Sequence, residues 1–152
     1  MMDYDRSLAI ARSMGYRFDA GCCWANAVQA LRLYHKQLGD VVYVEGWCAM
    51  PDISMVQEHG WLESDGTILD PTYAVPDDDQ GVRLRYEYFP AVRYRLEELK
   101  GVRLRSLPRV WKTDGFGGLR NEAYYAAMNA AYERIGYPPP AQQPGLREEL
   151  TR

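Results

Sequence analysis

Three side chains of complementary chemistry follow one another along the sequence: the thiol of Cys23, the imidazole of His59 and the carboxylate of Asp70. Cys23 stands where an amphipathic helix is predicted to begin, and the other two lie on one predicted β-hairpin. The chain has only two histidines, and the second, His35, is predicted to lie within that helix. A thiol, a base and an acid that orients the base are the parts of a cysteine-based acyl-transfer site.

The chemistry of such a site explains why these residue types belong together. A free thiol has a pKa of about 8.5, and helix N-terminal amides with a neighbouring imidazolium can lower that value to roughly 3.5–7.5. The backbone N–H of Cys23 would supply one donor of an oxyanion hole. A second donor is needed, and Gln29 and Gln57 are the side-chain candidates.

The choice of nucleophile lies between two adjacent cysteines, Cys22 and Cys23. Two neighbouring helical residues differ by about 100° in direction, so only one of them can face the hairpin. Cys23 is favoured because it shares a helix face with Ala27 and Ala30, whose small side chains leave room for a partner strand. We therefore predict Cys23 as the nucleophile.

The three cysteines are predicted to be free thiols. Their number is odd and two are adjacent, which argues against a disulfide framework. Zinc sites favour two cysteines separated by two to four residues, and this chain lacks that spacing. We predict neither a metal nor another cofactor, and Cys48 is interpreted as a small buried apolar side chain.

Helical periodicity predicts three helices. The first covers residues 3–14, and the second runs from Cys23 to about Leu38 and ends before Gly39. The third begins near Leu119 and ends at Gly136. One or two helical turns are also expected within residues 93–100.

Alternating or β-branched runs predict an antiparallel meander between the helices. The expected strands cover residues 41–47, 56–63, 67–73 and 82–89, with a further candidate at 102–111 and a loop at 48–55. Helices, then a meander, then a helix make the predicted fold class α+β: N-terminal helices packed on an antiparallel sheet, with a C-terminal helix.

The Asp65-Gly66 turn sets the register that the catalytic hypothesis requires. Asp-Gly between apolar runs is the strongest short hairpin signal, and a two-residue turn pairs Ser64 with Thr67. His59 and Asp70 are then diagonal neighbours on one sheet face, roughly 7–8 Å apart at Cα. A turn longer by one residue would place them on opposite faces.

Composition predicts one folded domain and a tail. The chain has 152 residues and 47% hydrophobic content. We expect a single catalytic domain over residues 1–137 and a Pro-rich, disordered tail over 138–152. No stretch reaches the roughly 20 apolar residues that a membrane span needs. No export signal is recognised, so the cytoplasm is the expected compartment.

Charge supplies a second functional hypothesis of a different class. Residues 81–120 carry 10 basic and 4 acidic side chains, whereas residues 1–80 carry 5 basic and 13 acidic ones. The basic segment 83–112 could hold an acidic protein or nucleic acid in a non-catalytic binding module. The alternative, which we favour, is that these basic residues form the solvent-exposed face of a sheet, because Arg83 and Arg85 alternate with apolar residues.

Four short motifs carry a family resemblance: Cys23-Trp-Ala-Asn-Ala27, Tyr43-Val-Glu-Gly46, Glu58-His-Gly-Trp-Leu62 and Asp65-Gly-Thr-Ile-Leu-Asp-Pro-Thr72. In this order they resemble the papain-like/transglutaminase-like superfamily of cysteine enzymes, and especially its small bacterial and phage members. The resemblance covers residues 20–73, about a third of the chain. The vicinal Cys22 departs from the pattern.

The resemblance implies a nucleophile at Cys23, a base at His59 and an orienting acid at Asp70. The superfamily includes peptidases, amidases, deamidases, transglutaminases and acetyltransferases, so the implied function is hydrolysis or transfer at an amide or related acyl bond. The expected partner is a protein or peptide-like substrate, with nucleic acid less favoured and no membrane.

Three residues near the proposed triad are candidates for substrate binding: Trp24, Asn26 and Trp61. Each of them could instead have a purely structural role. The two tryptophans could be core side chains, and Asn26 could brace the neighbouring loop by a hydrogen bond. Asp70, which precedes Pro71, could likewise serve only as an acceptor that closes a turn.

Overall fold

The computed structural model describes residues 1–15, 22–75, 84–104 and 122–140. These ranges contain three α-helices, α1 (Tyr4–Ser13), α2 (Cys23–Leu38) and α3 (Glu122–Arg134), and two short 3₁₀ helices, η1 (Pro51–Ile53) and η2 (Leu96–Leu99). The predicted bounds of α2 are confirmed. The helix ends before Gly39, which has φ of 76°, a backbone angle that glycine adopts without strain.

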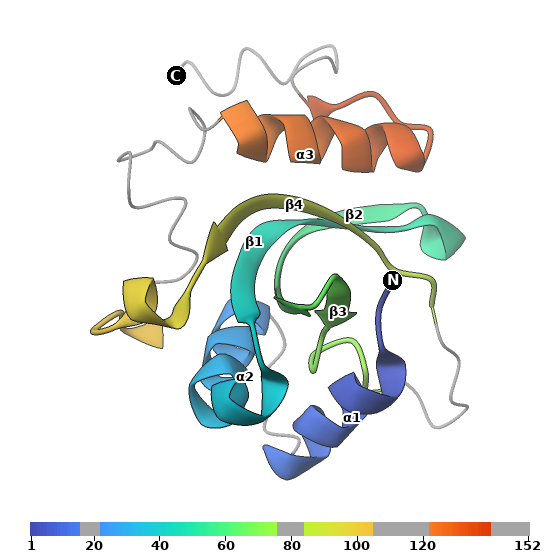
Figure 1. Cartoon of the computed structure of the whole chain (residues 1–152). Coiled ribbons are helices and arrows are strands. Elements are labelled where there is room, and N and C mark those ends of the chain that lie inside the picture. Colours follow the sequence, from blue (N-terminus) through green and yellow to red (C-terminus); the bar gives the residue numbers. More distant parts are fainter. Residues whose placement is uncertain (16–21, 76–83, 105–121, 141–152) are drawn as a thin grey trace.

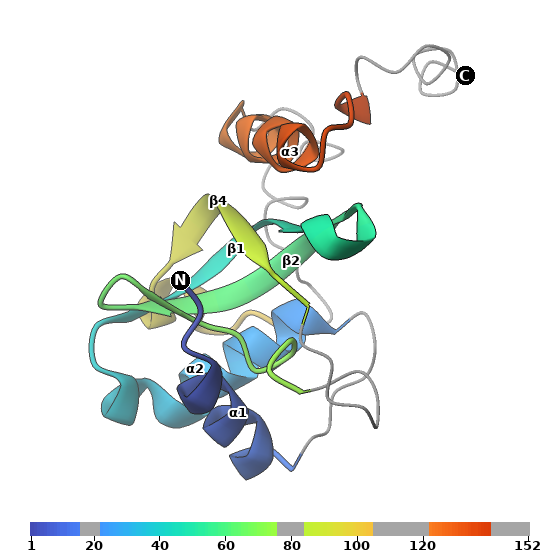
Figure 2. The same ribbon diagram turned by 90° about the vertical axis from the view of Figure 1, so that its right-hand side faces the viewer.

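Four strands form one antiparallel sheet in the order β3-β2-β1-β4. They are β1 (Val41–Met50), β2 (Met55–Ser64), β3 (Thr67–Leu69) and β4 (Glu87–Tyr94). The sheet separates α3 on one side from α1 and α2 on the other (Figures 1 and 2). The predicted α+β class and its order of elements are confirmed.

The main core lies between α2 and the sheet. Small and branched side chains of α2, such as Ala27 and Leu31, pack with Tyr43 of β1, Leu62 of β2 and Leu69 of β3. These side chains are fully buried, and burying each large one contributes on the order of 1.5–3 kcal/mol. This packing fixes the start of α2 relative to β2.

A second, aromatic contact joins the sheet to α3. Trp47, near the far end of β1, packs at 5.5 Å from Tyr124 and at 6.5 Å from Tyr132, measured between ring centroids. Figure 1 shows β1 curving between these two regions, so that one strand contributes to both packing layers.

The β2–β3 hairpin has the predicted register. Asp65 and Gly66 both have positive φ, of 51° and 74°, as a type I′ turn requires, and Ser64 pairs with Thr67. The second strand of this hairpin was predicted over residues 67–73. That range is too long, because β3 ends at Leu69. The chain turns at Pro71, which has no N–H to donate to a ladder.

The first three residues run alongside β3. Met2 forms a parallel bridge with Ile68, in which the Asp3 N–H donates to the Ile68 carbonyl at 2.9 Å and the Ile68 N–H donates to the Met1 carbonyl at 3.2 Å. The short outer strand of the sheet is thereby covered on its open edge.

Three other strand predictions need correction. β1 continues to Met50, so the predicted 48–55 loop shrinks to η1 and Ser54, which has φ of 51°. β4 covers Glu87–Tyr94 rather than residues 82–89 and includes Pro90, which an edge strand tolerates. The described start of the 102–111 candidate, residues 102–104, is not a strand.

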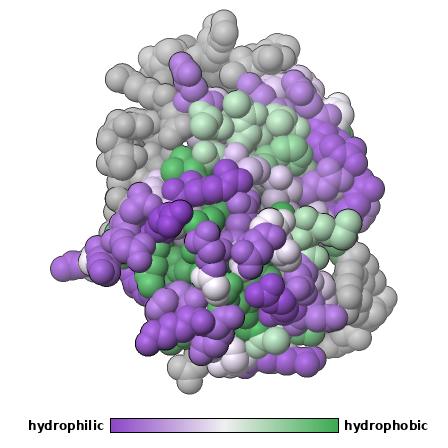
Figure 3. Space-filling view, viewed as in Figure 1, coloured by the Kyte–Doolittle hydropathy of each residue, from purple (hydrophilic) through white to green (hydrophobic). Residues whose placement is uncertain are grey.

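Parts of some predictions lie outside the described residues: 105–111 of that candidate strand, the first residues of the third predicted helix, and 141–152 of the predicted tail. No helix in the described ranges is both long enough and apolar enough to span a membrane. In the view of Figure 1, hydrophilic residues cover much of the described surface, with hydrophobic ones showing between them (Figure 3).

Candidate active site

Cys23 is the first residue of α2, and its side chain is nearly buried, with 8% of its surface exposed. The helix begins with the Asn26 N–H donating to the Cys22 carbonyl at 2.9 Å. Cys22 makes no side-chain capping bond, and the first turn contains no acidic residue. The amides of this turn favour a negative charge on a group placed beside them.

His59 and Asp70 form a short, fully buried pair. His59 lies on β2 opposite Gly46, and Asp70 follows the end of β3. The distance from His59 Nε2 to Asp70 Oδ2 is 2.6 Å, and neither residue has any exposed surface. The diagonal relationship that the Asp65-Gly66 turn predicts thus places the two side chains in direct contact.

Cys23 lies close enough to His59 to contribute to the pKa of the imidazole. Burial lowers the pKa of His59, but the Asp70 charge and hydrogen bond, with a smaller contribution from Cys23, outweigh burial and raise that pKa to about 10. Since Asp70 occupies Nε2, Nδ1 is the nitrogen left for the sulfur. Nδ1 is buried and has no hydrogen-bond partner within the described residues. The structure therefore joins the imidazole and the carboxylate directly, and it places Cys23 close enough to affect the pKa of the same ring.

The two oxygens of Asp70 have different partners. Oδ1 accepts hydrogen bonds from the backbone N–H groups of Thr72 and Tyr73, at 2.9 and 3.2 Å. Oδ2 accepts from His59 and from the Tyr88 hydroxyl, the latter at 2.8 Å. Oδ1 thus closes the turn, as one interpretation of Asp70 predicts, and Oδ2 makes the contact with the imidazole that the orienting interpretation requires.

The backbone of Asp70 is held as well, because its N–H donates to Ser7 Oγ of α1 at 2.9 Å. The carboxylate is thus fixed from its own turn, from β4 and from α1. A carboxylate held in this way orients the imidazole rather than following it.

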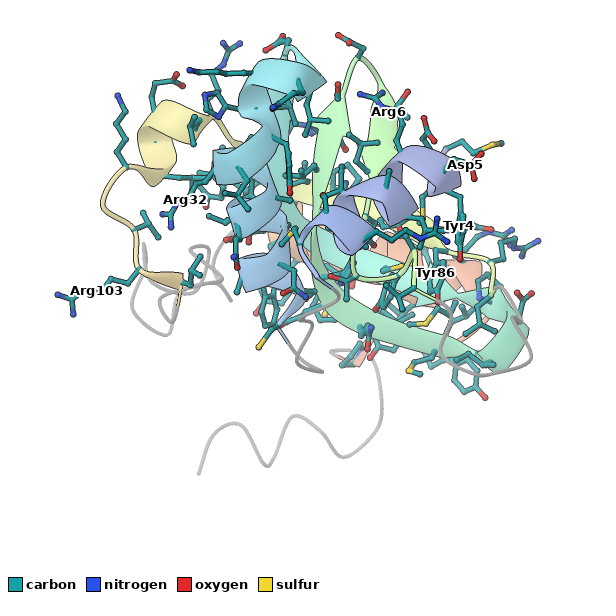
Figure 4. All side chains as sticks on the ribbon, turned by 90° about the horizontal axis from the view of Figure 1, so that it is seen from below. Tyr4, Asp5, Arg6, Arg32, Tyr86 and Arg103 are labelled. Atoms are coloured by element: carbon teal, nitrogen blue, oxygen red, sulfur yellow. The ribbon has the colours of Figure 1, made fainter. Side chains whose placement is uncertain are left out.

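Aromatic rings surround the imidazole. Tyr73 stacks on His59 with ring centroids 4.1 Å apart and planes inclined by 10°, and Tyr86 stacks on Tyr73 at 4.3 Å. Trp61 lies parallel to His59 at 6.1 Å. Figure 4 shows Tyr86 on the side of the molecule where α1 lies, away from Arg32. These rings exclude water from the His59–Asp70 pair.

The candidate substrate-binding residues have mainly structural contacts. Trp61 is fully buried, so it supports the His59 ring and does not line an open cleft. Asn26 is 4% exposed, and its Nδ2 donates to Thr72 Oγ1 at 3.3 Å, which makes it a brace between α2 and the turn after β3. Trp24 is half-buried and lies against Gly60, where its Cδ1 would be 2.6 Å from an added Cβ.

The other named residues lie around this centre in different ways. Gln57 shares a face of β2 with His59, because it is two residues away along the strand, whereas Gln29 is exposed on α2. Cys48 is fully buried, and all three thiols are free. His35 is half-buried, and its Nδ1 lies 3.2 Å from the Arg32 carbonyl within the same helix.

Sequence reasoning missed three residues that contact the pair: Ser7, Tyr73 and Tyr88. Tyr73 carries a usable signal, since an Asp-Pro-Thr run predicts an Asx-type turn that brings the following residues back to the carboxylate. Tyr88 carries none, because its contact depends on the register of β4 against β1, where Tyr88 pairs with Cys48.

The basic segment is described only in part, over residues 84–104. Arg85 pairs with Glu87 at 3.2 Å, and Arg93 pairs with Glu63 at 2.7 Å. Arg32, labelled in Figure 4, donates to the carbonyls of Leu99 and Val102. It also lines a cavity of about 410 Å³. Arg32 lies nine positions after Cys23, about 14 Å along the helix, so this cavity is distinct from the triad.

Within the described ranges, no three His, Cys, Asp or Glu side chains are arranged to hold a metal ion together. Comparison of the chain with protein-family models, with curated proteins and with solved structures found no match.

Proposed function

We propose that this chain is a cysteine-dependent hydrolase or acyltransferase that acts on an amide or a related acyl bond. The observation that carries the proposal is the buried His59–Asp70 pair at 2.6 Å, with the Cys23 side chain beside the same imidazole at a helix N-terminus. A structural histidine needs one hydrogen-bonding partner. It does not need a thiol close to the same ring.

Each residue has a defined role in the proposed reaction. His59 holds the proton taken from Cys23 as an imidazolium, in keeping with its raised pKa. The Cys23 thiolate attacks the carbonyl carbon to give a tetrahedral oxyanion, which the N–H groups at the start of α2 stabilise. The His59 imidazolium then protonates the leaving amine, and a thioester on Cys23 remains. Water, or a second amine or hydroxyl, resolves the thioester. Asp70 keeps the ring in one orientation throughout.

Exposure defines the direction from which a substrate approaches. Of the three groups, only Cys23 has exposed surface, and it lies beside the half-buried Cys22 and Trp24. The substrate carbonyl therefore reaches the sulfur from the α2 side, while His59 and Asp70 stay behind it. A protein or peptide-like substrate that presents an extended acyl group suits this geometry.

The order of the three residues supports a papain-like/transglutaminase-like assignment. A helix-start cysteine, a strand histidine and an acid after the next strand occur in one antiparallel α+β unit. Fold alone does not define a substrate, so peptidase, amidase, deamidase and transglutaminase chemistry all fall within the proposal.

The experiment is a mass-spectrometric search for covalent adducts on the intact chain after incubation with cell lysate, followed by peptide mapping. The proposal expects an acyl adduct on Cys23 that hydroxylamine releases, as it does thioesters. Cys22→Ala is the matched control and should keep the adduct, whereas Cys23→Ala should lose it. An adduct that survives Cys23→Ala, or turnover of an identified substrate by that variant, would overturn the proposal.

The binding-module alternative has weaker support. Two of its described cations, Arg85 and Arg93, are paired with glutamates of this chain, which reduces the charge that they offer to a partner. Salt-sensitive retention on an anionic column, lost when arginines of the 83–112 segment become serine, together with no labelling of Cys23, would favour the module.

A further inference from the structure

Tyr88 donates its hydroxyl to the same oxygen that holds the imidazole. Its Oη lies 2.8 Å from Asp70 Oδ2, the atom that His59 Nε2 approaches to 2.6 Å. The Tyr88 ring is also tilted against the rings of His59, at 6.2 Å, and Trp61, at 5.1 Å. Tyr88 is on β4, the strand farthest from β3 in the sheet order.

The Tyr88 hydroxyl stays protonated and donates its hydrogen bond to the Asp70 carboxylate. Burial, and then the charge of Asp70, raise the pKa of Tyr88 well above its usual value, so the group stays protonated. The Met2 sulfur is the other neighbour, at 3.3 Å. A thioether is a weak acceptor and a carboxylate is a strong one, so the single proton points to Asp70.

We propose that Tyr88 is a positioning residue that acts through Asp70: its hydroxyl shares Oδ2 with His59 and limits how strongly the carboxylate holds the imidazolium. This inference rests on the proposed function, because the retained proton matters only if His59 must return it to a leaving group. A tyrosine donor withdraws negative charge from Oδ2 and also prevents the carboxylate from rotating.

The physical consequence has a definite sign. Without the Tyr88 hydroxyl, Oδ2 keeps more of the carboxylate's negative charge. His59 Nε2 then no longer shares this oxygen with a second hydrogen-bond donor. The imidazolium is then stabilised, and the pKa of His59 rises. A more tightly held proton makes His59 a weaker general acid. If Tyr88 were only a packing residue, Tyr88→Phe would keep its ring in place and leave that pKa unchanged.

The test is a pH titration of the histidine ring signals by NMR on the full chain and on Tyr88→Phe. Only two histidines are present, so His35 serves as the internal reference. We expect Tyr88→Phe to raise the pKa of His59 by roughly 0.5–1 unit, with His35 unchanged. In the pH profile of the Cys23 alkylation rate, the midpoint of the alkaline transition should rise by the same number of pH units.

Two control variants separate this effect from lost packing. Tyr43→Phe removes another buried hydroxyl that donates to a carboxylate, Glu45 Oε1 at 3.0 Å, and should leave the pKa of His59 in place. Met2→Leu removes only the sulfur neighbour of Tyr88 and should also leave it in place. An unchanged or lowered pKa in Tyr88→Phe, or an equal rise in Tyr43→Phe, would overturn the inference.

The two proposals can fail separately. The ring titration does not depend on the reactivity of Cys23. If the pKa rises in Tyr88→Phe but Cys23 forms no adduct, the proposed enzyme fails while the link between Tyr88 and His59 stands. If Cys23 forms its adduct but the pKa of His59 is the same in Tyr88→Phe, the proposed enzyme stands and Tyr88 is only a packing residue.

Discussion

The Tyr73 ring covers one face of the His59 imidazole, with ring centroids 4.1 Å apart and the planes nearly parallel. Tyr73 also donates its backbone N–H to Asp70, the partner of that imidazole. A single residue therefore both closes the turn that holds the acid and shields the base from water. The burial that lowers the pKa of His59 comes partly from this ring.

The two parts of the Tyr73 side chain should have different effects on stability. Tyr73→Ala removes a stacked ring and should lower the free energy of unfolding by about 2–3 kcal/mol. Tyr73→Phe keeps the ring and removes only a buried hydroxyl that has no hydrogen bond within the described residues, so it should change that free energy by less than about 0.5 kcal/mol. Urea denaturation of both variants measures the difference. A larger loss in Tyr73→Phe would show that the hydroxyl has a partner.

Asp70→Asn should separate the two roles of this side chain. The amide oxygen of asparagine can still accept from Thr72 and Tyr73, so the turn should persist. The charge that outweighs burial is gone, so the pKa of His59 should fall from about 10 to below its ordinary 6.5. NMR titration against His35 measures this fall. A pKa that stays near 10 would mean that Asp70 is not the charge that holds the proton.

The raised pKa of His59 predicts how stability depends on pH. The ordinary value is 6.5 and the folded value is about 10, so the folded protein holds the proton more tightly than the unfolded chain. The resulting stabilisation is complete below pH 6.5 and is lost as the pH rises through 10, with a slope of at most about 1.4 kcal/mol per pH unit. Chemical denaturation at several pH values between 6.5 and 8 measures the slope.

The His59→Gln variant is the control for this slope and should lack it. Staying below pH 8 matters because burial raises the pKa of the Cys48 thiol, which adds a similar loss of stability only when the pH nears its ordinary value of 9.0. Equal slopes in the two proteins would contradict the assignment to His59.

Gly60 is predicted to set the approach of α2 to the sheet. A Cβ at this position would lie 2.6 Å from Trp24 Cδ1 and 3.0 Å from Trp24 Cα, the latter a backbone atom that cannot rotate away. Gly60→Ala should therefore lower the free energy of unfolding by about 1–3 kcal/mol and displace the start of α2. The alkylation rate of Cys23 should fall with it.

A double-mutant cycle tests this explanation. Trp24→Leu relieves the clash with the indole ring but leaves the close approach to the helix backbone, so the loss in the double variant should be smaller than the sum of the single losses. Additive losses would show that the alanine acts elsewhere.

Local signals in the sequence account for the parts of the site that were predicted. The bounds of α2 follow from its apolar periodicity and from Gly39, and the Asp65-Gly66 dipeptide sets the pairing that places His59 beside Asp70. Both features depend on residues close together in the chain. A single sequence specifies such short-range geometry well, because the turn type and helix period leave few alternatives.

The remaining contacts depend on long-range packing. Tyr88 reaches Asp70 only because β4 begins at Glu87 and pairs with Tyr43–Ala49 of β1, whereas apolar alternation favoured a strand over residues 82–89. A register break beside Gly46, where Ala91 has no partner, changes this pairing further. The sequence also did not decide whether Trp61 is a core side chain or lines a cleft. Apolar alternation assigns Trp61 to one face of the sheet, but it does not show whether other elements bury that face.

The segment that borders β3 gives the first residues of the chain a direct part in the architecture of the site. Met1 and Asp3 form backbone hydrogen bonds with Ile68, two residues before Asp70, and the Met2 sulfur touches the Tyr88 hydroxyl. A purification tag, a processing event or a truncation at these residues would thus act on the acid and its neighbours, although it lies far from them in sequence.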